Sequence, residues 1–289
     1  MNQFDQVMST IERAEFLEDP SVRVSEWLSK LYPGVFKDIA SGTALGHPAH
    51  PMLTDLPIGF WVGSLILDLV GGKKGQKAAD KMVLAGVMSA LPTAWTGISE
   101  WADCRGREMR VGTVHGLGNI AATLLYTGSY LARKKGERAR GVRLAILGAG
   151  ALTGAGFLGG HLAYRLGVGV DQTIFQTPPE EWTAVMAEDA LLNDEPAMAE
   201  VNGVPILVYR SGSSLYAIGD RCSHRAGPLH EGKIDQFNCA VTCPWHASKF
   251  SLRTGEVLGG PASAPQPSYE VRAEGGQIQV RAKQEVTHG

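Results

Sequence analysis

The stretch CSHRAGPLHEGKIDQFNCAVTCPWH, residues 222–246, contains two short motifs built from the same kinds of side chain. Cys222 and His224 form a Cys-x-His motif, and Cys243 and His246 form a Cys-x-x-His motif. The chain of 289 residues has only 4 cysteines, so half of its thiols lie in these motifs. Thiolates and imidazoles are side-chain ligands of zinc and of iron–sulfur clusters. The stretch therefore predicts a metal site.

The mixed pairing in each motif favours an iron–sulfur centre over zinc. Zinc sites more often use Cys-x-x-Cys or pairs of like residues. Two loops that each offer one cysteine and one histidine suit a [2Fe–2S] cluster in which one iron takes both thiolates and the other takes both imidazoles. On these residues alone, zinc stays the alternative.

The sequence around the two motifs predicts a small all-β domain. After Asp171 and a Pro-Pro pair at 178–179, short apolar runs alternate with turn residues such as Ser-Gly, Thr-Gly and Gly-Gly. We expect a linker over 172–183 and a β domain over 184–285. The predicted strands are 204–210, 214–219, 239–243, 249–252, 269–273 and 277–282.

The two motifs and their flanks resemble the ferredoxin-type Rieske [2Fe–2S] domain. The resemblance runs from NGVPILVYR before the motifs to GEVLGGPASAPQPSYEVR after them. It implies that one iron is bound by Cys222 and Cys243 and the other by His224 and His246. It also implies that Gly260 and Pro261 lie in a third loop that covers the cluster.

The resemblance further implies which residues surround the cluster. High-potential members of the family brace the two loops with a cysteine pair, but Gly227 and Trp245 stand at those positions here. Ser248 stands where the family often places a serine that donates to a bridging sulfide, whereas Phe250 replaces a tyrosine that donates to a ligand cysteine. We expect a reduction potential in the lower or middle part of the roughly −150 to +300 mV Rieske range. His230 reads as a surface loop histidine.

The segment between residues 51 and 163 is much more apolar than the rest of the chain. It contains four runs near the roughly 20 residues that cross a bilayer, at 51–71, 82–98, 111–132 and 144–164. Glycines at small-xxx-small spacing near 150–160 allow close helix packing in lipid. We predict a four-helix transmembrane domain over 46–171, after an amphipathic helical segment over 1–45. A soluble bundle of unusually apolar helices is the alternative.

The distribution of basic residues predicts the orientation of this domain. The loops around 72–81 and 133–143 hold ten Lys and Arg residues, whereas the opposite side of the bundle holds five. Because cytoplasmic loops are enriched in Lys and Arg, both termini are predicted on the exoplasmic side. The expected location is a multi-pass position in the bacterial inner membrane. The domain that needs an iron cluster would then have to cross that membrane.

GHPAHPMLTDLPIG at 46–59, together with the later VHG and GGHLAYRLGVGVD, resembles a family of four-helix bacterial membrane domains (DUF2231). Histidines inside membranes are costly and often functional. His50, His115 and His161 are predicted near one face of the bundle, where a pair from facing helices could hold a b-type haem or another metal. The alternative is that these imidazoles hydrogen-bond across the bundle.

Together these features predict a multidomain chain, an N-terminal four-helix transmembrane bundle joined to a C-terminal all-β Rieske iron–sulfur domain. We expect a membrane-anchored electron-transfer protein, a component of an oxidoreductase system and not a stand-alone catalyst, that works with redox protein partners in membrane lipid. A ferredoxin component of an oxygenase system and a redox sensor are alternatives, and a quinone is an alternative partner. The 43 residues from 247 to 289 are too few for a catalytic oxygenase domain, and a net charge of −2 argues against nucleic acid.

Overall fold

The computed structural model describes residues 3–283 and divides into two compact units. The helical unit contains Pro48–Val168 and the chain that precedes Gly34. The second unit combines Gly34–His47 with the chain from Gly169 onward. The sequence placed residues 1–45 in one segment, and the structure divides that segment between the two units. Residues 284 and 285, the end of the predicted β domain, lie outside the described residues.

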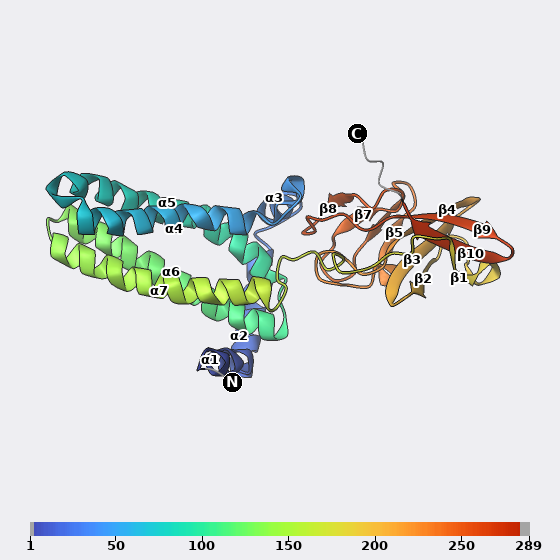
Figure 1. Ribbon diagram of the computed structural model, residues 1–289, viewed down its shortest axis with the longest axis horizontal. Coiled ribbons are helices and arrows are strands. Elements are labelled where there is room, and N and C mark those ends of the chain that lie inside the picture. Colours follow the sequence, from blue (N-terminus) through green and yellow to red (C-terminus); the bar gives the residue numbers. More distant parts are fainter. Residues whose placement is uncertain (1–2, 284–289) are drawn as a thin grey trace. The chain divides into compact units, whose positions relative to one another are not determined.

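Four long helices form the bundle of the helical unit, and Figure 1 shows them side by side. Each predicted span coincides with one of them: the first ends one residue beyond α4, the other three lie within their helices, and the helices extend beyond the predicted ends at most boundaries. Shorter helices of the N-terminal segment pack against α5 and α6. The helices of the chain are α1 (Gln3–Glu12), α2 (Glu18–Ser29), α3 (Val35–Ser41), α4 (Ala49–Val70), α5 (Gly72–Ala102), α6 (Gly106–Lys134) and α7 (Arg138–Tyr164).

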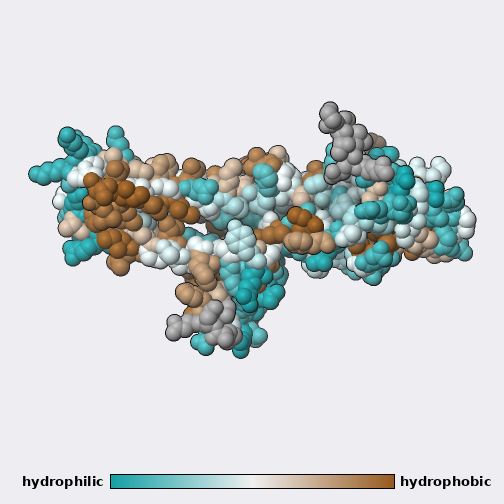
Figure 2. Space-filling view, viewed as in Figure 1, coloured by the Kyte–Doolittle hydropathy of each residue, from teal (hydrophilic) through white to brown (hydrophobic). Residues whose placement is uncertain are grey.

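Three of the four long helices, α4, α5 and α7, are long and apolar enough to cross a membrane. In contrast to the predicted count of four, α6 is not among them, although it has 29 residues. Polar and small side chains interrupt its apolar stretch, among them His115, Asn119 and Thr123. Large apolar side chains nevertheless face outward on all four helices, as Figure 2 shows for one side of the bundle.

The second unit contains three antiparallel sheets, with strand orders β1-β10-β9, β2-β3-β4 and β5-β6-β7-β8. All six predicted strands are present, and β1, β2, β5 and β8 are additional. The strands are β1 (Thr183–Ala187), β2 (Pro196–Val201), β3 (Val204–Ser211), β4 (Ser214–Gly219), β5 (Lys233–Asp235), β6 (Ala240–Thr242), β7 (Lys249–Ser251), β8 (Val257–Gly259), β9 (Tyr269–Glu274) and β10 (Gln277–Ala282).

Strand β3 is buried on both faces and lies between two hydrophobic cores. Because successive side chains of a strand point to opposite faces, Ile206 and Val208 enter one core, with residues of β9 and β10. Leu207 and Tyr209 enter the other, which contains Phe250 together with the cysteines of both metal-binding motifs. The motifs are therefore held by the second core.

Candidate metal centre

The two Cys/His motifs form two turns with the same backbone hydrogen bonds. The N–H of Ala226 donates to the carbonyl of Cys222 (2.8 Å), and the N–H of Ala247 donates to the carbonyl of Cys243 (3.1 Å). Both alanines have φ of 60°, the left-handed conformation that costs an L-residue about 1–2 kcal/mol. The surrounding structure must therefore hold both turns in place. Each turn begins with its cysteine, and its histidine follows two residues later in the first turn and three residues later in the second.

The turns bring the four predicted ligand side chains together. The Cys222 and Cys243 thiols are hydrogen-bonded to each other, and both cysteines are buried, with 1% and 3% of their surface exposed. The rings of His224 and His246 lie 5.1 Å apart between centroids and are perpendicular. His224 is also buried, whereas His246 is partly exposed. The two cysteine thiols thus lie together in the core, and the two histidine rings lie together next to them.

Metal ligands must be thiolates and neutral imidazoles. The surroundings of Cys243 and His224 favour these states, whereas the hydrogen bond with Cys243 and burial raise the pKa of the Cys222 thiol. The hydrogen bond from Cys222 and those from the backbone N–H groups of Trp245 and His246 together lower the pKa of Cys243 to about 7, against the effect of burial. Burial holds the pKa of His224 well below its ordinary value, and the positive charges of Arg225 and Lys37 act in the same direction. This donor set fits a cluster with two thiolate and two imidazole ligands.

Two glycines form the walls of the site at points where a side chain has no room. A Cβ on Gly227 would lie 2.9 Å from the Cys243 sulfur and 3.0 Å from the Trp245 ring. Gly227 and Trp245 therefore lie against each other. They are the residues that the resemblance predicts at the positions of the bracing cysteine pair. A Cβ on Gly260, whose φ is +86°, would lie 2.6 Å from the carbonyl oxygen of Ala247. The third loop thus packs directly on the second turn.

The remaining predicted residues surround this centre. Ser248 is fully buried, and its hydroxyl oxygen accepts from the N–H of Ala262 (3.1 Å), which leaves the hydroxyl proton to donate elsewhere. Phe250 is fully buried in the core that contains both cysteines. Pro261 is buried as well, whereas Trp245 is exposed beside His246. The sequence predicted no contact for Ala262, whose N–H fixes the serine.

The N-terminal segment Gly34–His47 packs on the third loop, which the sequence did not predict. Asp38 Oδ1 accepts from the N–H of Gly260 (2.7 Å), and Thr43 Oγ1 donates to the Gly260 carbonyl (2.7 Å). Lys37 of the same segment acts electrostatically on His224. The segment that precedes α4 is therefore part of the metal centre's surroundings. No local signal in the sequence links residues this far apart.

His230, predicted to be a surface loop histidine, is partly exposed and is bonded to a buried carboxylate. Its Nδ1 lies 2.8 Å from Asp220 Oδ2, and its backbone N–H donates to Asp220 Oδ1 (2.7 Å). Asp220 is 4% exposed and lies two residues before Cys222. The pair fixes the start of the first turn to the chain that follows it.

The structure brings together two of the three predicted membrane histidines. The rings of His50 on α4 and His115 on α6 lie 6.5 Å apart between centroids. His50 Nδ1 donates to the carbonyl of Thr93 (2.9 Å), and His115 Nδ1 donates to the carbonyl of Ala155 (2.8 Å). His161 is not part of this pair, because its Nε2 lies 2.8 Å from Glu12 Oε1 on α1.

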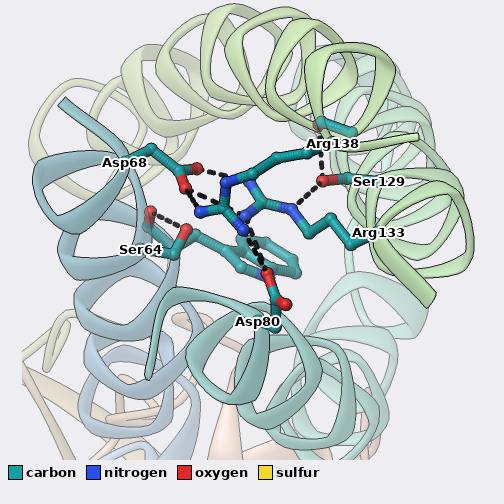
Figure 3. A network of polar contacts seen from close by, with 8 residues as sticks. Ser64, Asp68, Asp80, Ser129, Arg133 and Arg138 are labelled. Carbon is teal, nitrogen blue, oxygen red and sulfur yellow. Dashed lines mark hydrogen bonds and ion pairs between the residues drawn. The ribbon is translucent and has the colours of Figure 1, made fainter. Parts of the chain in front are cut away.

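A second polar cluster lies at the other end of the same helices (Figure 3). Arg133 is buried and forms ion pairs with Asp68 and with Asp80, the latter at 3.0 Å. Arg138 bonds to the same two carboxylates. Ser129 accepts from Arg133 Nε (3.1 Å). Because two arginines face two aspartates, the cluster has no net charge. Each of these four residues lies on a different long helix, so the ion pairs join all four helices.

Comparisons with known families match both units of the chain. A model of the Rieske [2Fe–2S] domain matches residues 181–270. A model of the family described as predicted membrane protein (DUF2231) matches residues 46–172. The two matches follow each other along the chain without overlap.

Curated relatives of the C-terminal unit are ferredoxin subunits. The anthranilate 1,2-dioxygenase ferredoxin subunit of Burkholderia cepacia is 37% identical over 100 residues, which cover 35% of this chain and 91% of that protein. The 3-phenylpropionate/cinnamic acid dioxygenase ferredoxin subunit of Escherichia coli K12 is 42% identical over 73 residues, 25% of this chain and 68% of that protein. Among solved structures, the ferredoxin of carbazole 1,9a-dioxygenase from Nocardioides aromaticivorans IC177 is 32% identical, covers 37% of this chain and all of that chain, and has a TM-score of 0.34.

Proposed function

The chain belongs to the Rieske [2Fe–2S] domain family, and we propose that it is a membrane-anchored protein that passes single electrons between a redox partner protein and an acceptor. A Rieske domain implies a [2Fe–2S] cluster, which supplies one-electron chemistry when bound. The observation that carries the proposal is the pairing of two buried thiols with two adjacent imidazoles on matching turns.

Within this proposal, Cys222 and Cys243 bind one iron, and His224 and His246 bind the other. The hydrogen bond between the thiols and the 5.1 Å between the ring centroids support this division of ligands. Phe250 and the other apolar residues of the second core exclude water from the sulfur side. The hydroxyl of Ser248 supplies a donor to a cluster sulfide, since its oxygen already accepts from Ala262.

Electron exchange with a partner is proposed to occur at the histidine side of the site. His246 is partly exposed, and Trp245 next to it is 55% exposed. An exposed aromatic ring beside a metal-binding imidazole gives a partner an apolar contact at the point where the distance to the metal is shortest. His224 lies behind this edge and is buried.

We place the helical unit in the bacterial inner membrane as a multi-pass anchor. Three helices with the length and composition of membrane spans support this placement, as does the match to a predicted membrane protein family. The outward-facing apolar side chains of α4–α7 would lie in lipid. The excess of Lys and Arg in the 72–81 and 133–143 loops supports an exoplasmic position for the Rieske domain. A haem or another metal in the bundle would extend the electron route into the membrane.

For the partner, the named relatives favour an oxygenase-type redox protein, because they are ferredoxin subunits of dioxygenases. The alternatives are a redox sensor, which signals without sustained turnover, and a quinone acceptor. Stopped-flow reoxidation of the reduced protein by each candidate acceptor separates them. A carrier is reoxidised rapidly and repeatedly by one acceptor, whereas a sensor is not.

The cluster assignment is tested by optical and EPR spectra of the full chain purified anaerobically in detergent. We expect the reduced wild-type protein to give a Rieske EPR signal that Cys222→Ser and Cys243→Ser abolish. Cys239→Ser is the matched control, because Cys239 is buried in the same core but lies outside the two motifs. A colourless wild-type protein, or one that contains stoichiometric zinc, would overturn the proposal.

A further inference from the structure

The four long helices consist of two copies of one helical hairpin. Corresponding residues of α4 and α6 are 65 positions apart, and those of α5 and α7 are 62 positions apart. Such self-similarity at a fixed spacing is the mark of an internal repeat. The matched pairs are His50 with His115, Trp61 with Tyr126, Ser64 with Ser129, Asp68 with Arg133, Gly86 with Gly148, and Gly97 with Gly159.

Matched residues make matched contacts in the structure. His50 donates to the carbonyl of Thr93, and His115 donates to the carbonyl of Ala155, its counterpart 62 positions later. A Cβ on Gly97 would lie 2.6 Å from the His50 ring, and one on Gly159 would lie 3.0 Å from the His115 ring. Each imidazole therefore occupies the same glycine-lined place within its own hairpin.

The aromatic residues three turns farther along repeat this arrangement. Trp61 packs on Gly86, and Tyr126 packs on Gly148. The two rings stack on each other, with 4.2 Å between their centroids and 3° between their planes. Residues at equivalent positions of two copies meet only on the two-fold axis that relates the copies. The Trp61–Tyr126 and His50–His115 pairs thus mark an internal two-fold axis of the bundle.

The hydrogen bonds of the histidine pair leave one nitrogen of each ring as an electron-pair donor. A backbone carbonyl can only accept, so Nδ1 of each ring carries the proton and Nε2 carries the lone pair. Metal-binding histidines have this arrangement, since the proton on the second nitrogen is normally fixed by a carbonyl or carboxylate.

The separation of the rings matches a shared metal ion. Two imidazoles whose Nε2 atoms bind one metal from opposite sides, at metal–nitrogen distances of about 2.0–2.1 Å, have centroids roughly 6.3 Å apart, and the centroids lie closer when the two bonds meet at a tetrahedral angle. The observed separation is 6.5 Å. Asn119 Nδ2 lies 3.2 Å from His115 Nε2 but also donates to the His115 carbonyl (3.0 Å), so it keeps a partner if it leaves the ring.

We infer that His50 and His115 together bind one imidazole-preferring transition metal on the internal two-fold axis, either as the iron of a haem or as a bare ion. Because the bundle has one His50–His115 pair on this axis, we expect one metal per chain. His161 is excluded as a ligand of this site, since it is bonded to Glu12. The binding inference is independent of the Rieske cluster, and only its redox role rests on the proposed function.

The test uses the full chain purified in detergent, as isolated and after equilibration with hemin or with Zn²⁺. His50→Asn and His115→Asn keep an amide donor near the place of Nδ1 but lack Nε2, so they preserve the bond to the carbonyl and remove the ligand. His161→Asn is the control. Metal content and acid-labile sulfide are measured together, so that cluster iron is subtracted, and the reduced absorption spectrum separates haem from a bare ion.

We expect the wild type and His161→Asn to bind one metal beyond the cluster, and His50→Asn and His115→Asn to bind it at least about tenfold more weakly. A Soret band that His50→Asn abolishes would identify haem iron as the source. The inference is overturned if the wild type binds neither hemin nor Zn²⁺ at this stoichiometry, or if both asparagine variants retain the metal. The Rieske EPR signal remains in every variant, so loss of that signal would concern the cluster assignment alone.

Discussion

The carboxylate of Asp38 accepts a 2.7 Å hydrogen bond from the backbone N–H of Gly260, 222 positions later in the chain. Thr43 donates to the carbonyl of the same glycine. The backbone donor and acceptor of Gly260 are thus both bound by the segment Gly34–His47. Since Gly260 packs on Ala247 and Ser248, this segment holds the third loop against the second cluster turn.

Replacing Asp38 should have two separate effects. It should weaken the attachment of the third loop, and it should change the reduction potential of the cluster. Asp38→Ala loses the acceptor and should destabilise the cluster-bearing unit by about 1.5–3 kcal/mol, the range for a hydrogen bond to a charged group. Asp38→Asn keeps an acceptor oxygen and should destabilise it less. Both variants remove a negative charge, which should raise the reduction potential. Denaturant-induced bleaching of the cluster and a redox titration measure the two effects.

The control for Asp38 is Glu200→Gln, which removes an exposed carboxylate on β2 of the same unit. It should change the bleaching midpoint and the potential little. Equal midpoints for Asp38→Ala and Glu200→Gln would show that the Asp38–Gly260 hydrogen bond does not hold the loop.

Adding one methyl group at Gly227 should reduce cluster occupancy. The new Cβ would lie 2.9 Å from the Cys243 sulfur and 3.0 Å from the Trp245 ring, so one of them must move. Overpacking of this kind typically costs about 1–3 kcal/mol. Iron and acid-labile sulfide per chain measure the loss. Gly59→Ala on α4, where a Cβ meets nothing within 4 Å, should leave both unchanged, and full occupancy in Gly227→Ala would contradict the geometry.

The residues around the sulfur ligands should tune the reduction potential in opposite directions. A hydrogen bond to cluster sulfur stabilises the more negative, reduced form. Ser248→Ala should therefore lower the potential by tens of millivolts, and Phe250→Tyr should raise it if the new hydroxyl reaches a ligand sulfur. Protein-film voltammetry measures both shifts. A potential that is unchanged in Ser248→Ala would mean that its hydroxyl proton points away from the cluster.

Local patterns predict the cluster turns and the long helices. The Cys-x-His spacing predicts that Cys222 and His224 share one tight turn, and the Cys-x-x-His spacing predicts the same for Cys243 and His246; the structure has a turn at each motif. Apolar length locates α4–α7. By contrast, β5 and β8 have three residues each and no alternating pattern, so periodicity could not identify them.

Long-range polar contacts could not be predicted from local patterns. The Asp38–Gly260 bond joins distant segments through one carboxylate and one backbone amide, and neither has a sequence signature. The pairing of His161 with Glu12 is similar, since α1 had no assigned partner in the bundle. The internal repeat leaves a readable trace in Gly63-Ser64 and Gly128-Ser129, but Asp68 faces Arg133 at equivalent positions, and such divergence conceals the duplication.

Asp68 and Arg133 carry opposite charges at equivalent positions of the two hairpins. The effects of replacing them on the stability of the bundle should therefore not be additive. Both side chains are 1% exposed, and removing either one leaves the other with a single ion-pair partner, Arg138 for Asp68 and Asp80 for Arg133. Each single loss should therefore stay below the about 3–5 kcal/mol that a fully unpaired buried charge costs. We expect Arg133→Met and Asp68→Leu each to lower the thermal stability of the bundle, followed by circular dichroism in detergent. The double variant should lose less than the two single losses combined, because it leaves no unpaired partner within that pair.

The matched control for this cycle is Arg140→Met. Arg140 pairs with Glu137 at the surface, where their side chains are 67% and 44% exposed, and exposed ion pairs contribute about 0–1 kcal/mol. Asp80 and Arg138 remain in every variant and keep part of the network intact, which sets a limit on how far the double variant recovers. Additive losses in the double variant would mean that Asp68 and Arg133 stabilise the bundle through other neighbours and not through each other.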